Sequence, residues 1–414
     1  MPSYYRRKRK NARALKERRV ALIAALAVLL VVLVVILSRC SGGRDVTTEN
    51  ASAQTPEPSA VAAMSAVTPE PTPEATPETT PEPTPEATPE MTPEPTPQPV
   101  SAEKTAAERA GNRPTAEQGW LPIFREAATE EKIVAITVDD CYQIGNLKEI
   151  IQLAIDNGGK LTIFPIGEQV LRESHAPVLK AAWEAGMELE NHTFTHNGLY
   201  NCSDEVLANE IYVQNYALNY ILGGEYECHF LRPRGGDARA DQRIHAYCKQ
   251  LGYAGIAHWT YSGREEGILQ KITPGAIYLF HCTDDDLNIL REFIPEVARQ
   301  GYRMVTMNEM FGYEDNAFTP KEIPYGIPEV PPLEPYDEVP VEYRKKRHAY
   351  GVFKIQTRLN ELGYLRDDPD GIFGDNTVKA VERFQKAAGL EVTGVATVEM
   401  QAKLFATDAP RYGG

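Results

Sequence analysis

The sequence predicts an α/β domain at residues 130–313 and a small all-α domain of three helices at residues 349–408. Three observations support this division. Short β-type runs alternate with helical runs in the first region, apolar residues recur at helical spacing in the second, and Pro-rich stretches precede both. Because 42% of the 414 residues are apolar, the chain can form one medium domain and one small domain.

The N-terminus predicts a membrane anchor. Residues 1–19 carry nine Lys and Arg against one Glu, and residues 20–37 form an uncharged apolar run of 18 residues. Such a run just covers the hydrocarbon core of a bilayer, and its basic flank predicts that the N-terminus is cytoplasmic. A cleaved signal peptide is the alternative, but the run exceeds a typical signal-peptide core and no A-x-A-like site follows it. We therefore expect a single-pass protein whose remaining residues lie outside the cell.

Residues 38–112 are predicted to form a disordered stalk. Residues 68–99 repeat Thr, Pro and Glu, which blocks regular structure and keeps the segment extended and solvated. At ~3.1 Å per residue, such a stalk could reach on the order of 200 Å. It contributes much of the acidic balance of the chain, 58 Asp and Glu against 43 Lys and Arg, which argues against nucleic acid as a partner.

The α/β region begins with a strand-like run, IVAITV at 133–138, followed by a helical pattern of apolar residues at Leu147, Ile150, Ile151 and Ala154. Alternation of this kind predicts parallel strands covered by helices, as either an α/β barrel or a doubly wound sheet. Further strand-like and helical runs follow at 161–166, 203–222, 278–281 and 288–301.

Polar clusters stand where several of these strands end. The first strand runs directly into Asp139 and Asp140, and three later clusters follow at 190–196, 231–237 and 278–281. In parallel α/β folds, chemistry gathers at the carboxyl ends of the strands. We therefore expect the four clusters to converge on one mouth.

Two of these clusters predict a metal site. His192 and His196 are four residues apart, so one helical turn would place both imidazoles on one side. With one carboxylate from Asp139 or Asp140 they supply the three ligands of a zinc-type catalytic site, and the other carboxylate could take a proton. Alternatively, the two histidines are ordinary polar loop residues and the Asp pair is a solvated turn. The position of the Asp pair at a strand end, and a later strand that ends in His281, disfavour this alternative.

The order of the motifs resembles the polysaccharide deacetylase (NodB-homology) family. TVDD, HTFTH, an Arg-Pro segment ending in Gly, and LFH follow one another over about residues 130–312. The resemblance implies a distorted (β/α) barrel. It also implies that Asp139, held by Arg232, is the general base and that His281 is the general acid.

The same resemblance implies the ligands and the substrate contacts. Asp140, His192 and His196 would bind a divalent metal, with Zn²⁺ as the first candidate and Co²⁺ or another divalent ion as alternatives. A main-chain N–H at Gly235 would stabilise the oxyanion, and Leu279 would line the acetyl pocket. Trp259, retained from the fourth motif, completes the substrate-binding candidates.

The sequence departs from the family's pattern at several positions. Cys141 follows the Asp pair in place of Gly, and the third motif reads Arg-Pro-Arg234-Gly-Gly, in which Arg234 is an exposed loop residue or contacts a substrate carboxylate. Ser262 stands where the fourth motif has the Asp that orients the acid histidine, and Asp284, Asp285 or Asp286 could substitute. Cys141 and Cys282 each follow a motif residue, and they either form a disulfide or are two small buried residues.

A Pro-rich linker at 314–345 leads to the C-terminal domain. Its predicted helices have apolar faces, with Asn376 as an N-cap and Gly389 as the C′ residue of the middle helix. Asp370-Gly371-Ile372-Phe373-Gly374 and later core residues resemble the peptidoglycan-binding domain type 1 family. That resemblance implies attachment to the cell wall.

Together these features predict a membrane-anchored, extracellular, metal-dependent deacetylase. It would hydrolyse N-acetyl groups of amino sugars in peptidoglycan or a related polysaccharide such as a chitin-like or exopolysaccharide chain. The alternative is a catalytically impaired deacetylase-like barrel that acts as a cell-wall-binding protein. Ser262 and the altered third motif favour the alternative, and the intact Asp139, Asp140, His192, His196 and His281 favour the enzyme.

Overall fold

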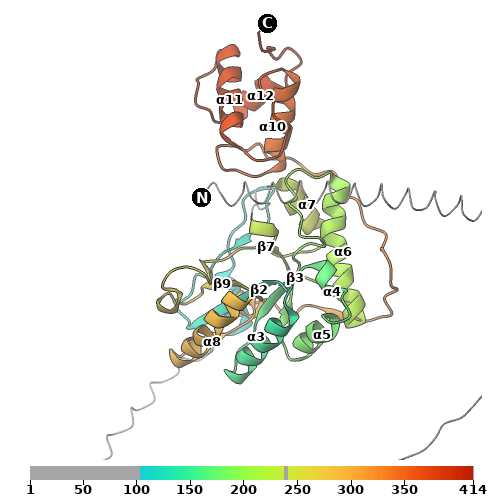
Figure 1. Ribbon diagram of the computed structural model, residues 1–414, viewed down its shortest axis with the longest axis vertical. Helices are drawn as coiled ribbons and strands as arrows, with labels where there is room; N and C mark the ends of the chain where they lie inside the picture. The colour runs from blue at the N-terminus through green and yellow to red at the C-terminus, as the bar shows by residue number, and fades with distance from the viewer. Residues whose placement is uncertain (1–102, 237–240, 414) are drawn as a thin grey trace, which may run out of the picture. The chain divides into compact units, whose positions relative to one another are not determined.

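The computed structural model describes residues 103–236 and 241–413 (Figure 1). The predicted anchor and nearly all of the predicted stalk lie outside these residues. Within them, no helix has both the length and the apolar character needed to cross a membrane.

The strands of the α/β domain surround a common interior. The main sheet has the order β4, β3, β2, β9, β8, with β10 paired to the start of β2, and a second sheet has the order β1, β7, β6. Isolated bridges join the two sheets, Asn191 with Leu231 and Glu126 with Ala276. The result is a distorted, incompletely closed barrel, which decides between the two arrangements left open by the sequence. The strands are β1 (Ile123–Phe124), β2 (Ile133–Asp140), β3 (Thr162–Pro165), β4 (Glu188–Leu189), β6 (Phe230–Leu231), β7 (Gly255–Ala257), β8 (Tyr261–Ser262), β9 (Ile277–His281) and β10 (Arg303–Met304).

The period of two along β2 separates its two faces. Val134, Ile136 and Val138 belong to the outer core, whereas Ile133 and Ala135 belong to the inner core with residues from β1, β3, β6, β7 and β9. Because side chains alternate along a strand, the last inward position of β2 is Asp139. The strand pattern therefore delivers a carboxylate to one end of the barrel interior.

Helices cover the outside of the strands, and Figure 1 shows α3 and α8 side by side next to β2 and β9. The predicted helix over 203–222 is α6, which Ser203 caps at its N-terminus, and Gly223 ends it with a φ of 79°. The helices of this domain that bear on the site are α3 (Ile144–Asp156), α4 (Gly167–Val170), α5 (Ala176–Glu184), α6 (Asp204–Leu222), α7 (Gln242–Gln250), α8 (Asp284–Arg299) and α9 (Met307–Met310).

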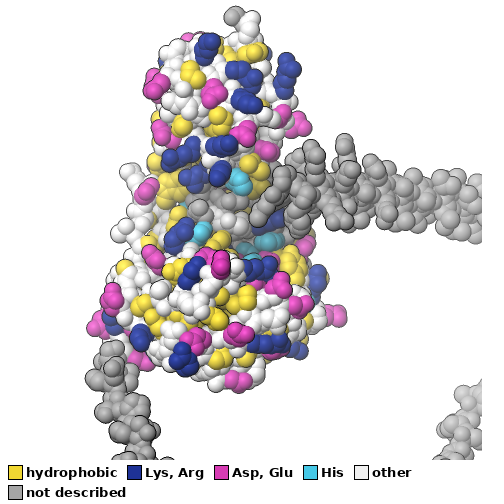
Figure 2. Space-filling model, turned by 60° about the vertical axis from the view of Figure 1, so that its left-hand side comes forward, with side chains coloured by type: hydrophobic (Ala, Val, Ile, Leu, Met, Phe, Trp, Pro, Cys, Tyr) yellow, Lys and Arg dark blue, Asp and Glu magenta, His cyan; other side chains and the backbone are white. Residues whose placement is uncertain are grey.

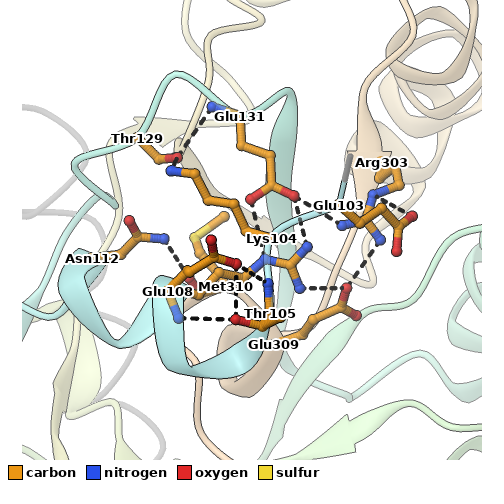
Figure 3. A network of polar contacts seen from close by, with 11 residues as sticks. Glu103, Lys104, Thr105, Glu108, Asn112, Thr129, Glu131, Arg303, Glu309 and Met310 are labelled. Carbon is orange, nitrogen blue, oxygen red and sulfur yellow. Dashed lines mark hydrogen bonds and ion pairs between the residues drawn. The ribbon is translucent and has the colours of Figure 1, made fainter. Parts of the chain in front are cut away.

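The last residues assigned to the stalk are ordered, which corrects the predicted boundary at 112. They form the short helix α2 (Ala106–Arg109), whose Arg109 makes ion pairs of 2.7 Å with Glu131 and 3.2 Å with Glu309 (Figure 3). Arg303 completes the network through the same two carboxylates. Because Glu131 precedes the first residue of β2, the network lies at the end of this strand opposite Asp139 and Asp140.

The segment 314–345 is likewise not a free linker. Its strand β11 (Phe318–Pro320) pairs antiparallel with β5 (Gly224–Tyr226). Further along, Gln250 donates to the carbonyl of Pro332 and accepts from the N–H of Glu334. Side chains of the α/β domain thus satisfy main-chain groups of a segment that is too rich in proline to pair with itself.

The C-terminal domain has the predicted three helices, α10 (Tyr350–Glu361), α11 (Asp375–Ala387) and α12 (Val398–Phe405), around a core of its own. Gly389 has the expected left-handed φ of 66°. The predicted N-cap at Asn376 is wrong, because α11 begins two residues earlier after Gly374. The Asn376 side chain instead donates a hydrogen bond to Asp367.

Candidate metal and catalytic site

A change of backbone direction at the end of β2 brings two adjacent carboxylates to one place. Asp139 ends the extended run, and Asp140 and Cys141 both have left-handed φ values, 70° and 64°. Adjacent side chains of a regular strand would point to opposite faces. Here Asp139 Oδ2 lies 3.7 Å and Asp140 Oδ1 lies 3.2 Å from the same nitrogen, Nε2 of His192. Left-handed non-glycine residues are uncommon and tend to mark functional sites.

His192 and His196 come together without the helical turn expected from their spacing. They lie in a loop after β4, in which Thr193 and His196 have φ values of 65° and 62°. The side chain of Glu210 on α6 accepts hydrogen bonds from the N–H and the hydroxyl of Thr195, which ties the loop to that helix. The two imidazole centroids are 4.7 Å apart. The predicted pairing is therefore present, but a different backbone produces it.

The geometry of Asp140, His192 and His196 fits a divalent metal ion. One ligand atom from each residue lies within 4.8 Å of the other two, and Asp140 Oδ1 is 3.2 Å and 3.3 Å from the two Nε2 atoms. That carboxylate oxygen is buried without a hydrogen-bond partner. The other ring nitrogen of His192, Nδ1, is 2.5 Å from the carbonyl of Arg232, so it donates there and leaves Nε2 free to bind.

The protonation of these groups also suits a metal ligand set. Burial, together with the nearby His192, lowers the pKa of His196 to about 4, which leaves the imidazole neutral at neutral pH. Burial alone would raise the pKa of Asp140, but the neighbouring His192 outweighs it and holds this pKa below its ordinary value. A neutral imidazole and an ionised carboxylate are the forms that bind metal.

Asp139 is held by a fully buried arginine. Arg232 Nη1 donates to Asp139 Oδ1 and to the hydroxyl of Thr137, both at 2.7 Å, and its guanidinium lies 4.1 Å from the centroid of the Phe164 ring. The Nη2 group donates to the carbonyl of His258. Arg232 therefore compensates the charge of Asp139 and engages one of its oxygens, while the other oxygen faces the histidines.

His281 ends β9 beside the Asp pair, since Asp139 and His281 are partners in the parallel register of β2 and β9. Of the three carboxylates that the sequence offered to replace the missing fourth-motif Asp, Asp286 is the one in contact. Its Oδ2 accepts from the His281 N–H at 2.9 Å and is 3.4 Å from the ring Nδ1. Asp284 instead accepts hydrogen bonds from Gln143 and Asn146.

The remaining predicted residues differ in burial and local contacts. Leu279 is buried on β9, and Gly235 is exposed with a φ of 63° just before the undescribed residues 237–240. The ring of Trp259 stacks on His258 at 4.1 Å. Cys141 and Cys282 are both free and buried, so the disulfide alternative is not formed. Histidine side chains reach the surface in Figure 2, among interspersed basic and acidic groups.

Two supporting residues were missed from the sequence. Thr137 could have been found, because it stands two residues before Asp139 and therefore on the same face of β2. Glu210 could not, because its bonds to Thr195 depend on how α6 packs against the loop after β4.

Comparisons with known proteins agree with the sequence resemblance in both segments. Residues 126–256 match the polysaccharide deacetylase family, and residues 349–404 match a peptidoglycan binding domain family. A peptidoglycan-N-acetylglucosamine deacetylase of Bacillus cereus is 27% identical over 221 residues, which are 49% of this chain and 96% of that protein. A peptidoglycan-N-acetylmuramic acid deacetylase of Bacillus subtilis is 22% identical over 195 residues, 44% of this chain and 72% of the relative.

Among solved structures, a CE4 family pseudoenzyme from Bacillus anthracis aligns with a TM-score of 0.41 and 22% identity. The alignment covers 46% of this chain and 68% of that one.

Proposed function

We propose that this chain, whose folded segments match the polysaccharide deacetylase and peptidoglycan binding families, is a metal-dependent hydrolase that removes N-acetyl groups from amino sugars of peptidoglycan. One observation carries the proposal. The ligand atoms of Asp140, His192 and His196 lie close together. Asp139, which is held by Arg232, contacts His192. A metal-binding set next to a separately held carboxylate is the arrangement that metal-assisted hydrolysis requires.

The protein groups divide the chemistry between them. Asp140, His192 and His196 would hold the divalent ion, Zn²⁺ or Co²⁺, which when bound polarises the acetyl carbonyl. Because Arg232 engages Oδ1 of Asp139, Oδ2 is the oxygen available to accept a proton from the attacking water. A main-chain N–H near Gly235 would stabilise the oxyanion.

The amine can leave only if its nitrogen receives a proton. His281 is the register partner of Asp139 on the neighbouring strand, so acid and base stand at the same level of the barrel. His281 would protonate the sugar nitrogen as the C–N bond breaks. The products are acetate and a free amino sugar. Leu279 and Trp259 would contact the acetyl group and the sugar.

Peptidoglycan is the proposed polymer because the C-terminal segment matches a peptidoglycan binding family and two relatives are named for peptidoglycan sugars. Those relatives differ in the sugar they are named for, N-acetylglucosamine in one and N-acetylmuramic acid in the other. Arg234, which is exposed, would contact a substrate carboxylate if the sugar carries one.

The proposed location is the outer side of the cell membrane, with residues 20–37 as the anchor. Within the described residues, the network of Arg109, Glu131 and Glu309 fixes helix α2 at the end of β2 opposite the metal site.

Acetate release from purified peptidoglycan tests the proposal. The full-length protein would be assayed with added Zn²⁺ or Co²⁺ and with a chelator, and its sedimentation with the wall would be measured in parallel. We expect acetate that depends on the metal. If the folded, metal-loaded protein sediments with the wall but releases no acetate, the cell-wall-binding alternative that Ser262 favours replaces the enzyme.

A further inference from the structure

The proposed acid, His281, is in contact with a carboxylate from helix α8. Ser262 on β8 occupies the place of the Asp that orients this histidine in the family pattern. We infer that Asp286, on the first turn of α8 and held by Arg264, is the positioning residue that fixes the ring of His281. This inference rests on the proposed deacetylase function, in which His281 protonates the leaving amine.

The first turn of α8 places the Asp286 carboxylate next to His281. Thr283 is the N-cap of the helix, and its hydroxyl accepts a hydrogen bond from the N–H of Asp286 at 3.2 Å. The carboxylate then turns back along the chain to His281, which offers its main-chain N–H at 2.9 Å and its ring Nδ1 at 3.4 Å. The Asp286 side chain is 1% exposed. One buried carboxylate therefore contacts both the backbone and the ring of the histidine.

Arg264 secures the same carboxylate from the loop after β8. Its Nε donates to Asp286 Oδ1 at 2.8 Å, and its Nη2 donates to the Thr283 hydroxyl at 2.9 Å. Arg264 stands only two residues after Ser262. The segment that lacks the family's Asp thus carries a cation that positions a replacement carboxylate from the next helix.

The charges around this pair keep the carboxylate ionised. Burial would raise the pKa of Asp286, but hydrogen bonds from His281 and Arg264 outweigh it and lower the pKa to about 2. The groups facing His281 are Asp286 from α8 and Asp139 and Asp140 from β2. Although burial opposes it, these carboxylates raise the pKa of His281 above its ordinary value.

The contact also selects the nitrogen that does the chemistry. With Nδ1 directed to Asp286, Nε2 is the ring nitrogen left to transfer a proton. A purely structural reading makes Asp286 a helix-capping residue with an ion pair to Arg264. That reading predicts a loss of stability on substitution and no change in how His281 titrates.

The test compares Asp286→Asn with Asp285→Asn in the full-length, metal-loaded protein. Asp285 is the neighbouring exposed residue, so its substitution makes the same charge change without touching His281. The ring titration of His281 would be followed by NMR, with the signal assigned by its loss in His281→Gln. We expect Asp286→Asn to lower the pKa of His281 by about one unit. The alkaline limb of the kcat profile should move down by the same amount, and Asp285→Asn should move neither.

An unchanged His281 titration in a folded Asp286→Asn protein would overturn the inference, whatever happens to Tm. If that variant does not fold, Arg264→Gln replaces it, because the Arg264 side chain is half exposed. Because this change leaves the charge of Asp286 to His281 alone, we then expect the pKa of His281 to rise, and no shift would equally reject the positioning role. If the wild-type protein releases no acetate, the proposed function fails, while the NMR titration still decides this inference.

Discussion

Two pairs of neighbouring carboxylates occur in this barrel, and their chemical environments differ. Asp139 and Asp140 end β2, where Arg232 and two histidines surround them. Glu188 and Glu190 stand on and just after β4, where their partners are neutral groups and each other. Arg232 compensates the charge of the first pair, whereas the second can persist in the interior only by retaining a proton.

The backbone brings the two pairs together in different ways. Glu188 and Glu190 are two residues apart on an extended segment, so they share a face without distortion. Asp139 and Asp140 are adjacent, and a left-handed residue is needed to direct both at His192. Strained backbone is therefore found at the pair proposed to do chemistry, and regular backbone at the pair that supports the fold.

The Glu pair has a structural role that its contacts define. Glu190 accepts from the N–H of Phe230 and from the side chain of Asn316, and Glu188 accepts from the N–H of Asn308 at the start of α9. Burial raises the pKa of Glu188 to about 7, and burial with the charge of Glu188 raises that of Glu190 well above its ordinary value. The contacts of this pair join strands and loops that are distant in sequence.

Asp139→Asn should produce the largest change in activity. If Asp139 is the general base, acetate release should fall by ~10²–10⁴-fold. Asp285→Asn is the matched control, because it removes an exposed carboxylate near the site and should retain activity. Activity within a few-fold of wild type in Asp139→Asn would assign the base elsewhere.

Arg232→Met should produce the largest change in stability. It leaves Asp139 buried without its cation, which is expected to cost about 3–5 kcal/mol in the free energy of unfolding measured with urea. The double variant Arg232→Met with Asp139→Asn should recover part of that loss, because no charge is then left unpaired. Equal stability of the single and double variants would show that packing of Arg232 on Phe164, rather than its charge, is what matters.

Glu188→Gln should alter the pH dependence of stability. Because the folded-state pKa of Glu188 is raised from 4.5 to about 7, the folded protein binds an extra proton between these values. The contribution to stability is then full below pH 4.5 and is lost as the pH rises to about 7. We expect Tm to fall less between pH 5 and pH 8 in Glu188→Gln than in wild type. The exposed Glu184→Gln should behave like wild type. Parallel Tm curves for all three proteins would reject the raised pKa of Glu188 in the folded protein.

Local patterns in the sequence were sufficient to predict the features that depend on nearby residues. The alternation of strand and helix, the helical run over 203–222 and the polar strand ends all follow from residues within one or two turns of each other. The resemblance to a known family added the order of the motifs and supplied roles for them.

The remaining features depend on contacts between distant elements. Neither Thr193 nor His196 carries a sequence signal for a left-handed φ, so a helical turn was the natural expectation for their spacing. The choice of Asp286 over Asp284 and Asp285 depends on how α8 docks beside β9. The attachment of residues 314–345 depends on Gln and Tyr side chains of helices that the linker sequence does not reveal.

The central claim is that two adjacent carboxylates have separate roles, Asp140 in binding the metal and Asp139 in taking the proton. Metal content and acetate release would be measured on the same purified samples of Asp139→Asn and Asp140→Asn. The account predicts that Asp139→Asn keeps the wild-type metal content and loses activity, while Asp140→Asn loses the metal and, with it, the activity. Loss of metal from Asp139→Asn with full retention in Asp140→Asn would contradict it.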